Sequence, residues 1–307
     1  MVSIVRAAAL VALIALGACQ GRIQQSAVKD FADALGVAAK RIDEGLTRVS
    51  QLETERQIDG AAPGYLAPLP RRKSGADPAP VTLPPRGGYG SAAVRHGLGD
   101  SLEFLAMYAQ HLAFLSGDEA TAPTEAAIKG LAQAAEAGIK QMGGLQGVSE
   151  EQAKGVGAIA VTIANVIVQY KVQAGLAEAV TRNQPNIQQF GQFIHEVVVG
   201  DGQIGLAASI KSDIEYVAEA RTRALGYIRS DPSVPADRRL AAWREIVARN
   251  RQDQAVAAIP GAIANAVDKM VEAHGKLAEP AKAGSSVGGF IAAVNEVTRL
   301  YEQARRS

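Results

Sequence analysis

The chain has little of what disulfide-rich, metal-binding or β-sheet proteins require. Its 307 residues include one cysteine, so no disulfide can form within the chain. The four histidines are scattered, without an H-E-x-x-H motif or a second cysteine, which excludes the usual zinc motifs. Aromatic residues make up only 5% of the chain, whereas alanine is plentiful. Because strands favour aromatic and β-branched residues and alanine is the best helix former, we expect an all-α protein of thin, closely packed helices.

A charge excess of either sign is also missing. The 32 basic residues face 31 acidic ones, which gives a formal net charge of +1. A chain so balanced has no long-range attraction for nucleic acid or for an anionic lipid surface, so we expect no nucleic-acid partner. Its length suffices for one large domain or two modest ones.

Residues 1–18 have the pattern of an export signal. Arg6 precedes an apolar run at residues 7–16, which is too short to span a membrane, since a span needs roughly 17–25 apolar residues. Small residues then lead to the cysteine in the order Leu16-Gly17-Ala18-Cys19. This order is similar to the lipobox of bacterial lipoprotein signal peptides. An ordinary secretory signal and an apolar core helix are the alternatives, but the only cysteine of the chain, directly after Ala18, favours the lipoprotein.

The resemblance implies a covalent membrane anchor. It implies cleavage between Ala18 and Cys19, a diacylglyceryl thioether on Cys19 and acylation, for example by palmitate, of the new amino group. Several acyl chains hold a protein on a bilayer far better than one. Gln20 stands where an aspartate is the usual signal for retention in the inner membrane. The resemblance therefore favours the periplasmic face of the outer membrane over the inner membrane.

A heptad pattern predicts one long helix at residues 24–58, within the segment 19–58 that begins at the anchor. Small or apolar residues recur in steps of three and four, and charged residues such as Lys29 and Lys40 lie off this seam. Such a helix either packs on the body of its own domain or forms a coiled-coil stalk or dimer seam. Ala38 and Gly45 favour close packing within the chain. The seam consists of Val28, Phe31, Leu35, Ala38, Ile42, Gly45, Val49 and Leu52.

The helical pattern is interrupted at residues 59–90, which predict a linker. They contain seven of the thirteen prolines and the basic cluster Arg71-Arg72-Lys73. Because proline blocks a helix interior and removes a backbone donor, we expect an extended, disordered connection.

The last segment, residues 91–307, predicts an α-helical domain of about seven or eight helices. Apolar stripes at helical spacing are separated by turn signals. Asn183-Gln184-Pro185 and residues 231–235 are expected to end helices, and Pro260-Gly261 to start or kink one. Trp243, the only tryptophan, is expected to anchor the core.

The most apolar helix is expected to begin at Ser149, which forms a capping box with Gln152. Residues 155–170 contain no charge, so this helix is expected to be buried on every side. The alternative is a segment that inserts into a membrane. Sixteen residues that include Thr162, Asn165 and Gln169 are short and polar for that role.

Two catalytic or nucleotide-binding motifs occur without the context they require. Residues 200–205 match G-x-G-x-x-G, but no second strand with an acidic residue follows, which favours a turn between helices. Residues 284–288 match the nucleophile elbow G-x-S-x-G, but no strand precedes them and no histidine follows Ser286. We therefore expect Ser285 or Ser286 to cap a helix.

The remaining polar groups favour structural roles. His96, Asp100 and Glu103 share a helical face, which is more typical of a solvated surface than of a metal site. Glu150 and Glu151 lie in a first helical turn, where the dipole accounts for them. We expect no catalytic residue, cofactor or metal ion.

Together these patterns predict an envelope lipoprotein rather than an enzyme. It would be anchored through Cys19 and act as a helical interaction or structural module that docks on a protein partner in the envelope, through its helices or through the loop at residues 59–90. A membrane-active protein that uses residues 155–170 is the alternative.

Overall fold

Eight helices and no strand make up the described part of the chain, which confirms the all-α class. The computed structural model describes residues 2–66, 92–117, 124–143, 148–169, 176–200 and 204–305, without the side chains of residues 2–24, 57, 59–66, 92, 95, 167, 169 and 280. The helices are α1 (Val2–Leu66), α2 (Ala92–Leu115), α3 (Glu125–Gln141), α4 (Glu150–Gln169), α5 (Leu176–Val198), α6 (Leu206–Ser230), α7 (Ala236–Lys276) and α8 (Pro280–Arg305).

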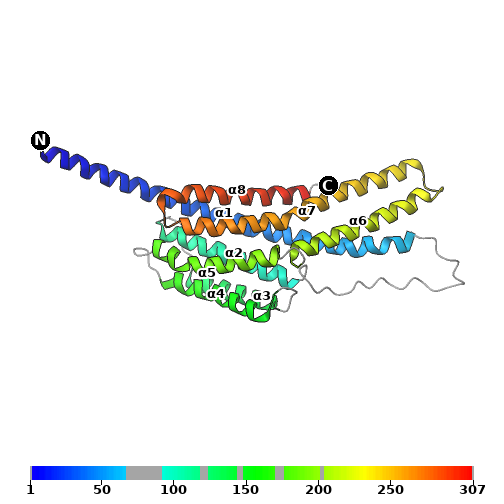
Figure 1. Ribbon diagram of the computed structural model, residues 1–307, viewed down its shortest axis with the longest axis horizontal. Coiled ribbons are helices and arrows are strands. Elements are labelled where there is room, and N and C mark those ends of the chain that lie inside the picture. Colours follow the sequence, from blue (N-terminus) through cyan, green and yellow to red (C-terminus); the bar gives the residue numbers. More distant parts are fainter. Residues whose placement is uncertain are drawn as a thin grey trace.

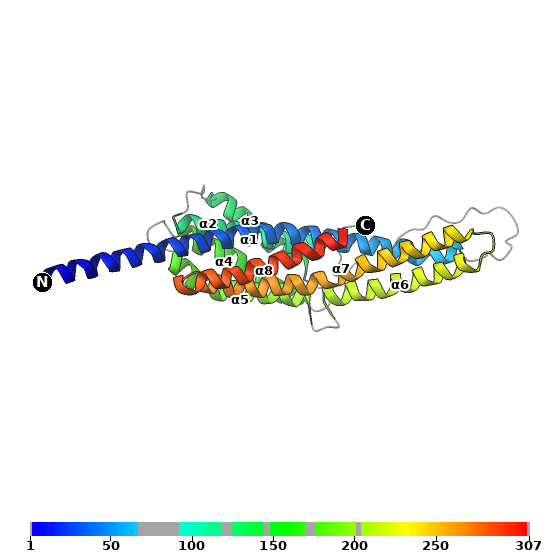
Figure 2. The same cartoon turned by 90° about the horizontal axis from the view of Figure 1, so that it is seen from above.

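The helices form an elongated bundle along α1 (Figures 1 and 2). Helix α1 contacts α2, α6, α7 and α8, while α2 to α5 pack in sequence against one another and α7 pairs with α8. The N-terminal turns of α1 project beyond one end of the bundle. At the opposite end α6 and the first half of α7, beside the C-terminal part of α1, extend beyond the end of α8. The two ends of the molecule are therefore built differently.

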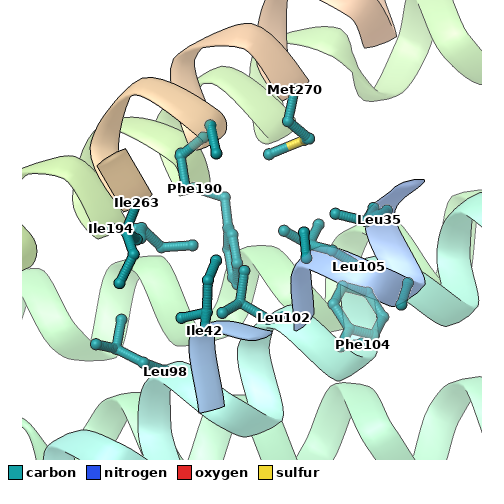
Figure 3. Close-up of a cluster of buried hydrophobic side chains, with 14 of the residues drawn as sticks. Leu35, Ile42, Leu98, Leu102, Phe104, Leu105, Phe190, Ile194, Ile263 and Met270 are labelled. Atoms are coloured by element: carbon teal, nitrogen blue, oxygen red, sulfur yellow. The ribbon is translucent and has the colours of Figure 1, made fainter. Parts of the chain in front are cut away.

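The heptad seam of α1 faces the core. All eight seam residues are buried, and α1 packs within the same core as the helices at residues 91–307. In Figure 3, Leu35 and Ile42 of α1 gather with side chains of α2, α5 and α7. A Cβ at Gly45 would lie 3.3 Å from Ile259 Cγ2, so the glycine lets α1 approach α7 closely. The structure therefore has the favoured alternative, in which this helix packs on the body of its own domain.

The long helix does not end where the linker was predicted to begin. Helix α1 continues to Leu66 and passes through Pro63, although the linker was predicted to start at residue 59. A proline three residues before a helix end removes a single internal hydrogen bond. The alanines before it are good helix formers and offset this loss. The remainder of the predicted linker, residues 67–90, lies outside the described residues.

Two prolines predicted to interrupt helices lie inside them. Asn183-Gln184-Pro185 does not end a helix, because α5 runs through Pro185, and α7 runs through Pro260 without a new start. In both helices the buried stripe keeps its spacing across the proline. Burial on both sides outweighs the cost of about 3 kcal/mol for a proline in a helix interior. The buried residues concerned are Val180, Asn183, Ile187, Phe190 and Ile194 in α5, and Val256, Ile259, Ile263 and Val267 in α7.

Helix α4 begins as predicted but is not buried on every side. The Ser149 hydroxyl accepts a hydrogen bond from the Gln152 amide at 3.0 Å, while the Gln152 side chain donates to Glu196 of α5 instead of returning to the cap. The helix packs against α3 and α5, and Ile163 is buried. Its outward face carries small or polar residues, which explains how the uncharged stretch from residue 155 can lie at the surface. These exposed residues are Gly155, Ala158, Thr162 and Asn165.

Candidate functional site

The predicted lipidation site lies in the projecting part of the long helix. Ala18 and Cys19 belong to α1, eight or more residues before Ala27, the first buried side chain that is described. Their side chains lie outside the described residues. The first buried side chain among those described therefore lies about two helical turns after the predicted anchor.

A helical hairpin forms the opposite end of the molecule. Helices α6 and α7 are joined by a turn at residues 231–235, in which the Asp231 carboxylate accepts hydrogen bonds from the Ser233 amide at 2.8 Å and the Ser233 hydroxyl at 2.6 Å. These bonds lower the pKa of Asp231. Pro232 and Pro235 flank the turn and resist continuation of α6 into α7. We call residues 222–252, which include this turn, the hairpin tip.

Charged side chains join the root of the hairpin to α1. The buried Arg221 of α6 donates to Asp253 of α7 at 2.5 Å, and its Nη2 lies 3.6 Å from Glu55 of α1. Arg56 of α1 pairs with Asp213 of α6. Burial raises the pKa of Asp253, and Arg221 opposes that rise. Three helices are thus tied together where the hairpin leaves the bundle.

Beyond this root the hairpin buries nothing completely. From residue 222 to residue 252 every side chain is half-buried or exposed. A hollow of about 190 Å³ lies between the two helices, lined in part by Ile228 of α6 and Ile246 of α7. Because helices are stabilised mainly by burying an apolar face, the hairpin tip is weakly packed on its own.

The prediction that Trp243 anchors the core is wrong. Its side chain is 51% exposed, and Leu240 one turn earlier is 46% exposed. Helical spacing identifies the apolar face of α7 but not how far the neighbouring helices reach. At this end α8 has already ended, so none of the described helices covers the face (Figures 1 and 2).

The hairpin tip also has an excess of positive charge. It contains seven arginines, no lysine and three carboxylates, a net charge of +4, so the rest of the chain, whose total is +1, carries −3. The balanced total had suggested no attraction for anionic surfaces, but the charge is segregated along the sequence. Two carboxylates of the tip are engaged, Asp231 with Ser233 and Glu245 with Arg249 at 2.7 Å. The third, Asp237, lies in the first turn of α7, which its charge stabilises.

Apolar and cationic side chains alternate on one face of α7. Each of Leu240, Trp243, Arg244, Val247 and Arg251 lies three or four residues from another member of the set, which places them on the same side of the helix. All are exposed except Val247, which is half-buried. Neither arginine forms an ion pair with any of the described residues. We call these five residues the Trp243 face.

A cleft of about 400 Å³ between α1 and α2 brings together the polar residues predicted to share a face. His96, Asp100 and Glu103 line it with Lys40 and Asp43 of α1. Among the described residues, no group of three or more His, Cys, Asp or Glu side chains has the arrangement of a metal site.

The other histidines have structural surroundings. His274 is fully buried, and because Gln184 Oε1 can only accept, His274 Nδ1 donates to it at 2.5 Å. His274 Nε2 then accepts from the Tyr108 hydroxyl at 2.7 Å. Burial lowers the pKa of His274 to about 3, so the ring is neutral. Burial also lowers the pKa of His111, whereas His195 lies on the surface, 3.2 Å from Asp268.

Neither sequence motif has catalytic geometry in the part of it that the structure describes. Gly200 and Gly205, with φ of +65° and +132°, belong to the turn between α5 and α6, as predicted for the G-x-G-x-x-G match. Residues 284–288 lie inside α8, which starts at Pro280, so the expectation that Ser285 or Ser286 caps a helix is wrong. The Ser285 hydroxyl instead donates to the Lys282 carbonyl. The helix starts earlier because Val287 and Ala283 both face the core.

Comparison with protein-family models, with curated proteins and with solved structures finds no match for this chain. The described helices contain no segment long and apolar enough to cross a membrane. The site is therefore defined by its own geometry. Sequence reasoning missed the Trp243 face, although one signal for it is present: seven arginines without a lysine in 31 residues around the only tryptophan.

Proposed function

We propose that this protein is a lipid-anchored envelope protein that works as a helical interaction module. The observation that carries the proposal is the path of α1. One continuous helix leads from the lipobox cysteine along the bundle to the root of the α6–α7 hairpin. A protein held at Cys19 would present the hairpin at its opposite end. The proposal assigns the protein no catalytic activity and no cofactor.

The hairpin tip supports the interaction role. A run of thirty-one residues without a buried side chain is unusual in an exported protein unless another surface contacts these residues. Leu240 and Trp243 lie exposed there, and tryptophan and arginine are the residues that most often dominate binding energy at interfaces. The root, tied by Arg221 and Asp253, holds this surface in a defined position.

The envelope location is part of the proposal and rests on the lipobox resemblance. With Gln20 after the cysteine, we place the anchor on the periplasmic face of the outer membrane. The alternative, a membrane-active protein that uses residues 155–170, lacks comparable support. The exposed positions of α4 in that segment are small or polar, and its Ile163 points into the bundle.

The anchor is tested by mass spectrometry of the N-terminal peptide and by detergent phase partitioning. The wild-type protein should begin at an acylated Cys19 and enter the detergent phase. Cys19→Ser should remain an uncleaved precursor without fatty acid, whereas the control Ser26→Ala, an exposed residue of α1, should behave as wild type. Normal maturation of Cys19→Ser, or a native N-terminus without lipid, would refute the anchor. Gln20→Asp should shift the protein toward the inner membrane.

The interaction role is tested by site-specific photocrosslinking in intact envelopes. A photoreactive residue at the exposed Ala241, in the hairpin tip, should give crosslinks to the molecule that the tip contacts, whether protein or phospholipid. The same residue at the exposed Ala292, on α8, is the matched control and should give fewer. Equal crosslinking at both positions, or none at Ala241, would contradict a docking role for the hairpin.

A further inference from the structure

We propose that the hairpin tip docks on an anionic phospholipid bilayer, with the Trp243 face as the inserting surface. This inference rests on the proposed function, because it names what the free end of the molecule contacts. It goes beyond the anchor, since it assigns a second membrane contact at the end opposite Cys19.

The first argument is charge. The tip carries a net +4 while the rest of the chain carries −3, so an anionic surface attracts this end and repels the remainder. Basic residues close to an anionic membrane contribute about 1 kcal/mol each. A second copy of this chain is disfavoured as the occupant, since two tips in contact would bring like charges together.

The second argument is the kind of cation. All basic residues of the tip are arginines. The planar guanidinium group matches a phosphate oxygen pair with two parallel hydrogen bonds, which the lysine ammonium cannot do. Arg244 and Arg251 are exposed and pair with none of the described carboxylates, so they are free to bind phosphate. This chemistry favours a phosphate-bearing surface over an acidic protein.

The third argument is the apolar part. Leu240 and Trp243 are large apolar side chains that are exposed on the same face of α7. Surface-bound amphipathic helices bury their apolar residues about 5–10 Å deep at the boundary of headgroups and acyl chains. Tryptophan is enriched at that boundary, with arginine side chains reaching the headgroups. The hairpin is also a protruding end rather than a groove, which suits a flat bilayer (Figure 1).

Trp243 provides its own reporter, because it is the only tryptophan in the chain. The acylated protein is reconstituted in neutral phosphatidylcholine vesicles and mixed with acceptor vesicles that contain phosphatidylglycerol and brominated acyl chains. We expect the Trp243 emission to shift to shorter wavelength and to be quenched by the acceptors. Acceptors of neutral phosphatidylcholine should cause neither change. Placing the brominated chains in the donor vesicles tells whether the tip instead folds back onto its own membrane.

Matched variants distinguish this contact from nonspecific adsorption to vesicles. Arg244→Gln with Arg251→Gln should weaken acceptor binding about 30-fold, at roughly fivefold for each arginine. The control, Lys129→Gln with Lys154→Gln, changes two exposed lysines of α3 and α4 and should have no effect. Leu240→Ser should reduce quenching by acceptors, whereas Val37→Ser, at another exposed apolar residue, should not. Circular dichroism confirms that each variant is folded.

Four results would overturn the proposal. These are unchanged emission with anionic acceptors, equal quenching by neutral ones, displacement of bound acceptors by an oligonucleotide at stoichiometric amounts, and a tip-dependent dimer in the absence of vesicles. Failure of the tip and failure of the anchor are distinguishable. If the native protein is acylated but acceptor vesicles do not quench Trp243, only the second contact is refuted. If the native protein carries no lipid but acceptor vesicles quench Trp243, only the anchor is refuted.

Discussion

The burial of His274 makes the stability of the protein depend on pH in the acidic range. Its pKa is about 3 in the folded protein and 6.5 in the unfolded chain, so below pH 6.5 only the unfolded state binds the proton. Stability is therefore lost as the pH falls from 6.5 toward 3, with a slope of up to about 1.4 kcal/mol per pH unit. Urea denaturation between pH 7 and pH 4 measures this slope.

The matched variant for this prediction is His274→Gln. Glutamine retains a polar group beside Tyr108 and Gln184 but does not titrate, so its slope should be smaller than that of the wild type. His111, whose pKa is also lowered by burial, contributes in the same direction in both proteins and cancels in the comparison. Parallel pH profiles for the two proteins would show that His274 is not protonated on unfolding.

Asp253 offers a second test at this scale. Asp253→Ala leaves the buried Arg221 guanidinium without its closest carboxylate, while Asn250 Oδ1 at 3.3 Å and Glu55 at 3.6 Å remain near it. Breaking a buried ion pair in this way typically costs about 3–5 kcal/mol of unfolding free energy. Glu245→Ala breaks the more exposed pair with Arg249 and should cost about 0–1 kcal/mol. Similar losses for the two variants, measured by urea denaturation, would contradict the role of the root.

At the scale of helices, the crossing of α2 and α3 depends on two glycines. A Cβ at Gly138 would lie 2.8 Å from Gly97 Cα, and a Cβ at Gly97 would lie 2.8 Å from the Gly138 carbonyl oxygen. Both contacts are with backbone, which cannot move aside without separating the helices. Gly138→Ala should therefore destabilise the protein by about 1–3 kcal/mol, as overpacking does.

The control lies on the same helix. Gly130 of α3 is exposed, and a Cβ added there would meet no atom within 4 Å. Gly130→Ala should therefore stabilise the protein by about 0.5–1 kcal/mol, since alanine is the better helix former. Thermal unfolding of the two variants should shift in opposite directions. A shift of the same sign would mean that the crossing relaxes at little cost.

Helix class and core faces were predictable because they follow from local periodicity. The seam of α1 and the cap at Ser149 depend on residues a few positions apart, and both are found. The ends of helices at Pro185 and Pro260 were not predictable in this way. Their continuation depends on burial against helices that are distant in the sequence. The same reason applies to Trp243, whose exposure is decided by where α8 ends.

At the scale of the whole molecule, the candidate site is the end of the bundle at which fewer helices pack together. Charge balance over 307 residues concealed a tip of +4, because a total carries no information on position. The fold separates the two features, since α1 extends about 70 Å from Cys19 to Leu66 at 1.5 Å per residue. The proposed anchor at Cys19 and the Trp243 face are consequently far apart, as the proposed contact with two surfaces requires.

The smaller number of packed helices at this end predicts uneven protection from hydrogen exchange along a single helix. In α7, residues 256–274 include the buried Val256, Ile263, Val267 and Met270, whereas residues 236–252 bury nothing. Local opening of the hairpin tip breaks few apolar contacts, so its amides should exchange faster at a free energy below that of global unfolding. Mass spectrometry of peptides from the two halves of α7 measures the difference, with α8 peptides around Phe290 as the protected reference. Equal protection in both halves would mean that the ion pairs at the root hold the tip as firmly as the core holds the bundle, and the tip would then meet its partner as a rigid surface.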